Sequence, residues 1–323
     1  MNSQQVKEWA KGFGADLVGI ASREHFENLP ADINPASIYP EYKAVIVVAR
    51  RVLRGALRGV EEGTNFGSTY GSFGFNWLED NFLSKTTYDL TCRIEEENFE
   101  AVPLFGYQDL DMKYGIPVAD GKPAPNVIVD SNYAAQAAGL AEYGLCGLML
   151  SEKYGHRQRF AVILTDAELE CDTPKSKTIC VDCDACVSGC PLGAINPEKT
   201  TMTGVPGYEM PIAEVNAAIC AACDNGAACG RGRGNHRDRL AAACARSCMI
   251  QLEKDKKLEG KFTNEFRKRT PWARDQLGHG VHAHRGLGLL PRATVFLDPY
   301  LCADPGCDRS RLVGLIILCR LFG

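Results

Sequence analysis

The feature that most constrains this chain is a run of four cysteines within twelve residues. The run reads CVDCDACVSGCP (180–191), with the spacing C-x2-C-x2-C-x3-C and a proline after the last cysteine. This spacing holds 4Fe–4S clusters in bacterial iron–sulfur proteins, where the fourth cysteine binds the other cluster of a two-cluster protein. A zinc site is the alternative, but zinc commonly takes its ligands from separated CxxC pairs. The run therefore predicts iron–sulfur clusters.

A second cluster needs further cysteines, and the sequence supplies them downstream as C-x2-C and C-x3-C pairs. Because the fourth cysteine of the run binds the other cluster, the expected ligands cross between the two sites. The first cluster is expected to take Cys180, Cys183, Cys186 and Cys248. The second is expected to take Cys190, Cys220, Cys223 and Cys244. Cys229 competes with Cys223 as a ligand, and the sequence leaves this choice open.

The remaining composition favours a protein of a reducing compartment. The chain has fifteen cysteines, an odd number, and grouped cysteines in such a compartment more often bind metal than form disulfides. The first fourteen residues do not resemble a secretory signal. No apolar run approaches the ~20 residues of a membrane span. We therefore expect a cytoplasmic protein without membrane contact. A net charge of −4 disfavours a surface that binds nucleic acid throughout.

The part of the chain before the cysteine run has the pattern of an α/β domain. Apolar runs at 15–22, 39–50 and 160–165 are typical of buried strands, and they alternate with helical patterns. One such pattern, at 133–143, predicts a tightly packed helix. Residues 63–76 are rich in glycine and aromatic residues, and we expect a loop there.

The composition changes near residue 172, where cysteines become dense and aromatic residues become sparse. We place a first domain at 1–172 and a cluster domain at 173–255. The pattern indicates no role for the remaining segment, 256–323. The other cysteines, Cys146 among them, are interpreted as ordinary buried thiols.

The order of features around the run resembles the core shared by epoxyqueuosine reductases and reductive dehalogenases. An aspartate ends the strand VIVD (127–130), and a helix of small residues leads into AGL (138–140). An apolar stretch then ends in YG (154–155), a strand closes in LTD (164–166), and the cysteine run follows. The resemblance extends over about residues 5–250.

This resemblance implies a fold and a set of cofactors. The fold would be a nitroreductase-like α/β/α domain followed by a ferredoxin-like domain with two 4Fe–4S clusters. The first domain would bind cobalamin, and the clusters would pass single electrons to its cobalt and then to the substrate. The protein would be a cytosolic reductase. The alternatives are a two-cluster electron-transfer protein and an activation factor that reduces the cobalt of another corrinoid protein.

The resemblance also implies roles for residues before the run. Asp130 lies at the position of the acid in the epoxyqueuosine branch, with a helix N-cap as its alternative role. Tyr133 and Tyr154 are candidate proton donors by analogy with the dehalogenase branch, with core packing as the alternative. Three basic residues are candidate contacts for corrin amides or an anionic substrate, or else line the exposed face of a strand: His156, Arg157 and Arg159.

Departures from the family pattern indicate a separate branch. Asp130 is followed by SNYAAQAA, the second-cluster region carries a long Gly/Arg insert, and neither a tRNA-binding extension nor a twin-arginine signal is recognisable. The implied partners are an external low-potential donor of ferredoxin or flavodoxin type and a small-molecule or modified-base substrate. A basic surface for tRNA could form from seven residues, but charges that solvate a surface loop and a helix end are the favoured interpretation. These residues are Arg231, Arg233, Arg237, Arg239, Arg267, Lys268 and Arg269.

Overall fold

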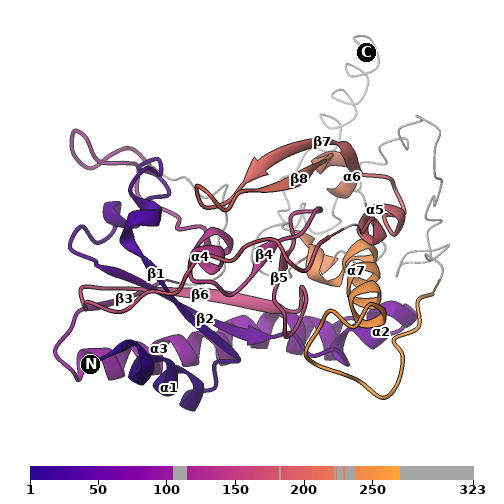
Figure 1. Ribbon diagram of the computed structural model, residues 1–323, viewed down its shortest axis with the longest axis horizontal. Coiled ribbons are helices and arrows are strands. Elements are labelled where there is room, and N and C mark those ends of the chain that lie inside the picture. The colour runs from indigo at the N-terminus through magenta and orange to yellow at the C-terminus, as the bar shows by residue number, and fades with distance from the viewer. Residues whose placement is uncertain (105–114, 182, 222, 224–227, 230–236, 270–323) are drawn as a thin grey trace, which may run out of the picture. The chain divides into compact units, whose positions relative to one another are not determined.

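The computed structural model describes one compact unit of the chain (Figure 1). The residues it describes are 1–104, 115–181, 183–221, 223, 228–229 and 237–269. Among these residues, no helix is both long and apolar enough to cross a bilayer. The segment after 269, to which the sequence assigns no role, lies outside the described residues.

Four antiparallel strands form the central sheet, in the order β1-β2-β6-β3. They span Leu17–Ser22 (β1), Ala44–Arg51 (β2), Gln158–Thr165 (β6) and Ala101–Leu104 (β3). Successive side chains of a strand point to opposite faces. Accordingly, Val45 and Val47 of β2 join one core cluster, whereas Ile46 and Val48 join the other. Burial on both faces explains the continuous apolar runs in the sequence.

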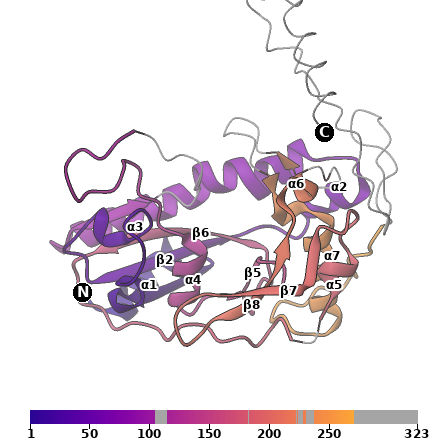
Figure 2. The same ribbon diagram turned by 90° about the horizontal axis from the view of Figure 1, so that it is seen from above.

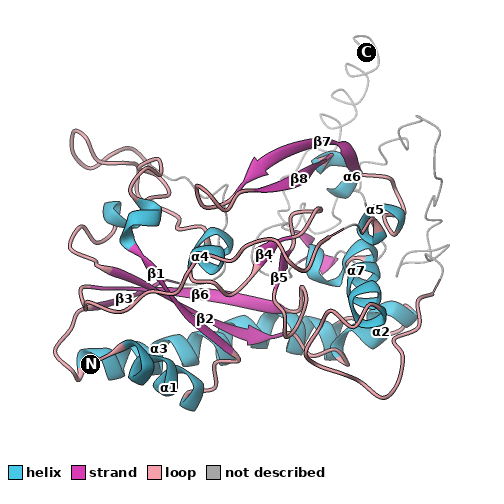
Figure 3. Ribbon diagram, viewed as in Figure 1, coloured by secondary structure: helices cyan, strands magenta, loops and turns pink. Residues whose placement is uncertain are grey.

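Helices cover both faces of this sheet (Figures 1 and 3). Helices α1 (Ser3–Gly12) and α3 (Ser84–Glu95) pack on one face, and α4 (Ser131–Ala137) packs on the other. Short 3-10 turns at Arg23–Phe26 (η1) and Pro35–Ser37 (η2) follow β1. The predicted α/β class is confirmed.

The loop expected at residues 63–76 is confirmed for 63–66 and is wrong for 67–76. Helix α2 (Ala56–Glu62) leads into two consecutive π-helical segments, η3 (Gly67–Asn76) and η4 (Leu78–Leu83). The cause is tertiary: the ring of Tyr70 is fully buried, and the carbonyl of Gly74 accepts a hydrogen bond from Arg159 Nε at 2.8 Å. Such contacts override the low helix propensity of glycine.

The helix expected over 133–143 is shorter than its pattern. It ends at Ala137 because Gly139 adopts φ +71°, and the next amide, that of Leu140, bonds back to the Ala135 carbonyl. This is the arrangement of a Schellman cap, which favours glycine. The chain then forms a small hairpin from β4 (Glu142–Tyr143) and β5 (Met149–Leu150).

The cysteine-bearing part follows β6 in the chain and belongs to the same compact unit as the sheet (Figure 2). It contains helix α5 (Ala185–Ser188), the hairpin of β7 (Ile195–Thr203) and β8 (Met210–Val215), and helix α6 (Ala217–Ala221). It ends with β9 (Ala228–Cys229), β10 (Arg237–Asp238), η5 (Arg239–Ala241) and α7 (Ala243–Lys254). The domain boundary near residue 172 stays a prediction.

Candidate functional site

The cysteines expected to bind the first cluster lie together. Cys180 and Cys183 stand in the loop before α5, Cys186 is on α5, and Cys248 is on α7. The Cys248 thiol interacts electrostatically with Cys180 and Cys183, and Cys186 interacts with both Cys180 and Cys248.

Gly189 explains how α5 and α7 approach so closely. A Cβ atom at this position would lie 2.1 Å from Ser247 Oγ and 2.7 Å from the Ala185 carbonyl oxygen. Any larger residue would push α5 away from α7 and separate the cysteines on the two helices.

The cysteines of the second expected set lie around Cys244, which is one turn before Cys248 on α7. Cys244 interacts with Cys190 and Cys220, and the Cys223 side chain is buried. The side chain of Cys229 lies outside the described residues, so the choice between Cys223 and Cys229 stays open. Within the described part of the chain, no three Cys, His, Asp or Glu side chains converge on the position of a single metal ion. A cluster does not require this, because each thiolate binds a different iron.

Backbone amides also reach sulfur atoms in both sets. The amide of Leu145 donates to Cys180 Sγ at 3.3 Å, and the amide of Ala194 donates to Cys190 Sγ at 3.2 Å. Such bonds stabilise negative charge on sulfur and raise cluster potentials.

Glu142 anchors the start of the cysteine run, and its role was not predicted. Its side chain is fully buried. Its carboxylate accepts backbone hydrogen bonds from Thr178 at 2.6 Å, Ile179 at 2.9 Å and Cys180 at 2.7 Å. A buried carboxylate needs such partners, and here they fix the loop that presents Cys180.

Cys146 was interpreted as an ordinary buried thiol, but it lies among the cluster cysteines. It is buried and hydrogen-bonded to Cys186, and it interacts with Cys180, Cys244 and Cys248. Spacing gave no sign of this, because the residue belongs to the hairpin after α4. It adds a further sulfur atom between the two expected sets.

Asp130 caps α4, as one of its two predicted roles requires. Its Oδ1 accepts from the amides of Asn132 at 2.8 Å and Tyr133 at 3.4 Å. The side chain is exposed, yet the surrounding protein desolvates the carboxylate enough to raise its pKa, while the two hydrogen bonds lower it. A carboxyl group that is reachable and holds its proton more tightly suits a proton donor.

A second tyrosine that the sequence did not single out lies near Asp130. Tyr143 is buried, and the charges of Asp130 and Tyr133 add to burial in raising its pKa. Tyr133 is half-buried, and its hydroxyl donates to the His25 carbonyl at 2.6 Å. The structure therefore brings Asp130, Tyr133 and Tyr143 together.

Tyr154 belongs to a different group. It is buried, and its hydroxyl lies 3.4 Å from Asp16 Oδ1, with the Arg51 guanidinium 6.0 Å from its ring centre. This position favours the packing role that the sequence left open.

The three basic candidates lie inside the protein rather than on an exposed strand face. His156 Nε2 contacts the Leu240 carbonyl at 3.1 Å, and burial lowers its pKa to about 3, so it is neutral. Arg157 donates to the Val52 carbonyl at 3.1 Å. Arg159 pairs with Glu79 at 2.9 Å and with Asp238. These contacts favour a structural role for Arg159.

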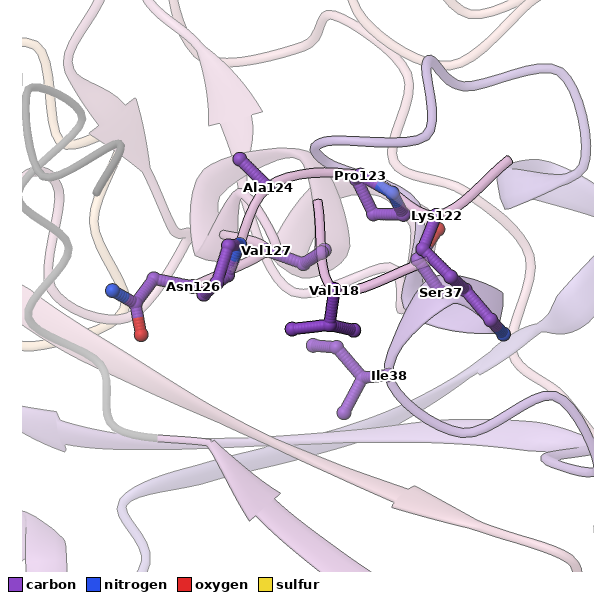
Figure 4. A pocket seen from close by; sticks show the side chains of 9 residues that line it. Ser37, Ile38, Val118, Lys122, Pro123, Ala124, Asn126 and Val127 are labelled. Carbon is purple, nitrogen blue, oxygen red and sulfur yellow. The ribbon is translucent and has the colours of Figure 1, made fainter. Parts of the chain in front are cut away.

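A pocket of about 450 Å³ lies beside the loop that leads to Asp130 (Figure 4). Ile38, Val118 and Val127 give it an apolar wall, and Lys122 is its one charged lining residue. Its lining ends at Val127, so it adjoins the acid without including it. We assign no ligand to it.

No protein-family model matches the chain. A tetrachloroethene reductive dehalogenase of Desulfitobacterium hafniense is 41% identical over 68 residues, which are 20% of this chain and 12% of that protein. A solved structure of a reductive dehalogenase is 15% identical to this chain. That structure is described as suggesting a mechanism for B12-dependent dehalogenation. It covers 87% of this chain and 41% of its own, with a TM-score of 0.51.

An epoxyqueuosine reductase bound to a modified tRNA stem loop is also similar. It is 14% identical and covers 79% of this chain and 68% of its own, with a TM-score of 0.47. The expected resemblance to the reductive dehalogenases is confirmed as a likeness of fold and of one 68-residue segment. The chain spans less than half of the dehalogenase structure, and the matched segment is 12% of the curated relative.

Proposed function

We propose that this protein is an iron–sulfur reductase that binds cobalamin and reduces its substrate beside Asp130. One observation carries the proposal: the segment Glu142–Cys146 contacts the cluster cysteines and also contains a tyrosine that feels the charge of the acid. Glu142 and Leu145 hold Cys180, and the charge of Asp130 adds to burial in raising the pKa of Tyr143. Five consecutive residues thus connect the electron-carrying site to the proton-carrying site.

The cysteines fit two 4Fe–4S clusters. The proximity of Cys248 to Cys180 and Cys183, and of Cys244 to Cys190 and Cys220, supports the crossed pattern, and amides reach sulfur in each expected set. Cys180, Cys183, Cys186 and Cys248 would hold one cluster, and Cys190, Cys220, Cys223 and Cys244 the other. When bound, the clusters would carry single electrons from a donor of ferredoxin or flavodoxin type.

Cobalamin comes to this chain from the resemblance, and the predicted contacts offer partial support. His156 Nδ1 and Arg157 Nε are buried and have no hydrogen-bond partner among the described residues. These two nitrogen atoms could form a hydrogen bond with a corrin amide or with a bound water. When bound, the corrin would supply a cobalt centre that becomes a strong nucleophile or reductant on reduction. Arg159 is already engaged by the protein.

The chain's own residues would supply the proton. Asp130 combines exposure with a raised pKa, so a larger fraction of it is protonated near neutral pH than of an ordinary aspartate. Its cap bonds fix the carboxyl group at the start of α4. Since only the protonated form donates, turnover is expected to fall as the pH rises through the pKa of Asp130.

We expect Asp130→Asn to fold normally and lose turnover. Asparagine caps helices as well as aspartate does. The raised pKa means that the folded protein binds the proton more tightly than the unfolded chain, so the ionised carboxylate costs stability above that pKa, and the variant removes this cost. Loss of a general acid lowers rates about 10²–10⁴-fold. Unchanged turnover, measured with an organohalide and an epoxide as probes, would leave Asp130 a capping residue.

The proposal is tested by purifying the protein without oxygen, offering cobalamin, removing the excess and measuring bound cobalt and iron. Retention of one cobalt per chain together with iron, and reduction of either probe, is the expected result. Iron without cobalt would contradict the reductase assignment and indicate an electron-transfer protein. Reduction of the cobalt of a second corrinoid protein, with no reduction of either probe, would indicate an activation factor. A small-molecule substrate is favoured over tRNA.

A further inference from the structure

Arg239 carries a positive charge into the middle of the cysteine sites. It stands in η5, directly before α7, and one of its terminal nitrogens donates to the Cys146 carbonyl at 2.9 Å. Its guanidinium lies within electrostatic range of Cys244 and Cys220. Both belong to the second expected set. The sequence had favoured a solvated surface loop for this arginine.

Nothing in the described part of the chain balances this charge. No carboxylate among the described residues pairs with Arg239, and its Nε is buried without a hydrogen-bond partner there. The neighbouring Asp238 is engaged by Arg159. Arg239 is part-buried and its Nε is fully buried, and arginine cannot lose its proton. The thiolates of the second expected set are anions within electrostatic range of this guanidinium.

The other cations near α7 differ in this respect. Arg246 is buried between the two α7 cysteines, but Glu61 neutralises it. Lys177 interacts with Cys180 of the first set, and Lys268 contacts Ser247, yet both are exposed. Solvent and salt screen exposed charges far more than buried ones. Lys257 is part-buried, but it donates to the carbonyls of Ile179 and Val181 beside Cys180, and Lys177 is the cation whose charge acts on that thiol. Arg239 is the part-buried cation whose charge acts on cysteines of the second set.

We propose that Arg239 is the counter-charge of the second cluster and raises its reduction potential above that of the first. Four thiolates make a 4Fe–4S cluster an anion, and reduction adds one more negative charge, which a fixed nearby cation favours. The second cluster would then be the more easily reduced of the two. The first would be the one that the Glu142–Cys146 segment contacts through Cys180.

The test is a redox titration followed by EPR, and it rests on the proposed function because both clusters must be present. Wild-type protein is expected to show two potentials. In Arg239→Gln, the equilibrium constant for reduction of one cluster is expected to fall at least tenfold. This corresponds to a reduction potential lower by ~59 mV for one electron. The potential of the other cluster is expected to stay unchanged. Cys220→Ser, which alters only the second cluster, identifies the signal that moves.

Two variants control for charge and for position. Arg239→Lys keeps the charge and is expected to hold both potentials near wild type, and Lys177→Gln is expected to move neither. If Arg239→Gln loses iron, the inference is tested by the difference between the two cluster potentials in the wild-type protein and in Arg239→Lys. Equal wild-type potentials, or a separation that survives in Arg239→Gln, would overturn the inference. A protein with fewer than two clusters would instead contradict the proposed function.

Discussion

Glu142→Ala is expected to empty the first cluster site while leaving the second occupied. The carboxylate accepts the amides of Thr178, Ile179 and Cys180, and the variant leaves these buried donors without partners. Hydrogen bonds to a charged group contribute about 1.5–3 kcal/mol each, and stranding buried partners raises the cost. We expect a loss of about 3–5 kcal/mol and a fall from about eight irons per chain to about four.

The measurement is iron content after anaerobic reconstitution, together with thermal unfolding followed by circular dichroism. Glu152→Ala is the matched control, because Glu152 lies in the following loop and forms an exposed pair with Lys175. Exposed pairs contribute little. Full iron content in Glu142→Ala would show that the loop holds Cys180 without this anchor.

Glu61→Ala is expected to be the most destabilising change in the part of the chain before the cysteines. Glu61 and Arg246 are both buried, and they join α2 to α7 between the two cysteines of that helix. Removing the carboxylate leaves a buried guanidinium unpaired, which costs about 3–5 kcal/mol. For a chain of this size, the unfolding midpoint should fall on the order of 10 °C.

Glu62→Ala provides the control at the next position of the same helix. Glu62 pairs with Arg267 and Arg269, both of which are exposed. We expect no measurable change in the unfolding midpoint from it. A midpoint for Glu61→Ala equal to that of Glu62→Ala would mean that the buried pair does not hold α7 against α2.

Three ion pairs, one buried on both sides and two part-buried, suggest why the cysteine-bearing part should not move as a separate carrier. Arg54 with Glu253, Glu61 with Arg246, and Arg159 with Asp238 all join residues before 172 to residues after 237. Breaking any one of them is costly. A fixed arrangement suits electron transfer to a site within the same chain.

Local patterns in the sequence predicted what depends on local structure. The sheet strands were recognisable because burial on both faces makes each a continuous apolar run, as in Ala44–Arg51. The cysteine run is contiguous in sequence, so its spacing alone predicts a cluster site. The crossing rule predicts that Cys248 joins the first set, and the structure brings Cys248 near Cys180 and Cys183.

Residues that act through distant contacts could not be read in the same way. Glu142 and Cys146 lie on a hairpin far before the run, and Arg239 appeared to be one charge of a Gly/Arg-rich loop. Only folding brings Cys146 and Arg239 to the thiols, and only folding turns residues 67–76 into a π-helical segment around buried Tyr70. Periodicity and spacing carry no signal for such contacts.

The central claim is that two clusters with crossed ligands sit beside the Asp130 site. Its most direct test is the iron content and EPR spectrum of the anaerobically reconstituted and reduced protein, compared with Cys248→Ser. We predict about eight irons per chain and two interacting EPR signals. Cys248→Ser and Cys180→Ser are expected to alter the same one of these two signals. About four irons, or a Cys248→Ser change shared with Cys190→Ser instead, would contradict this account.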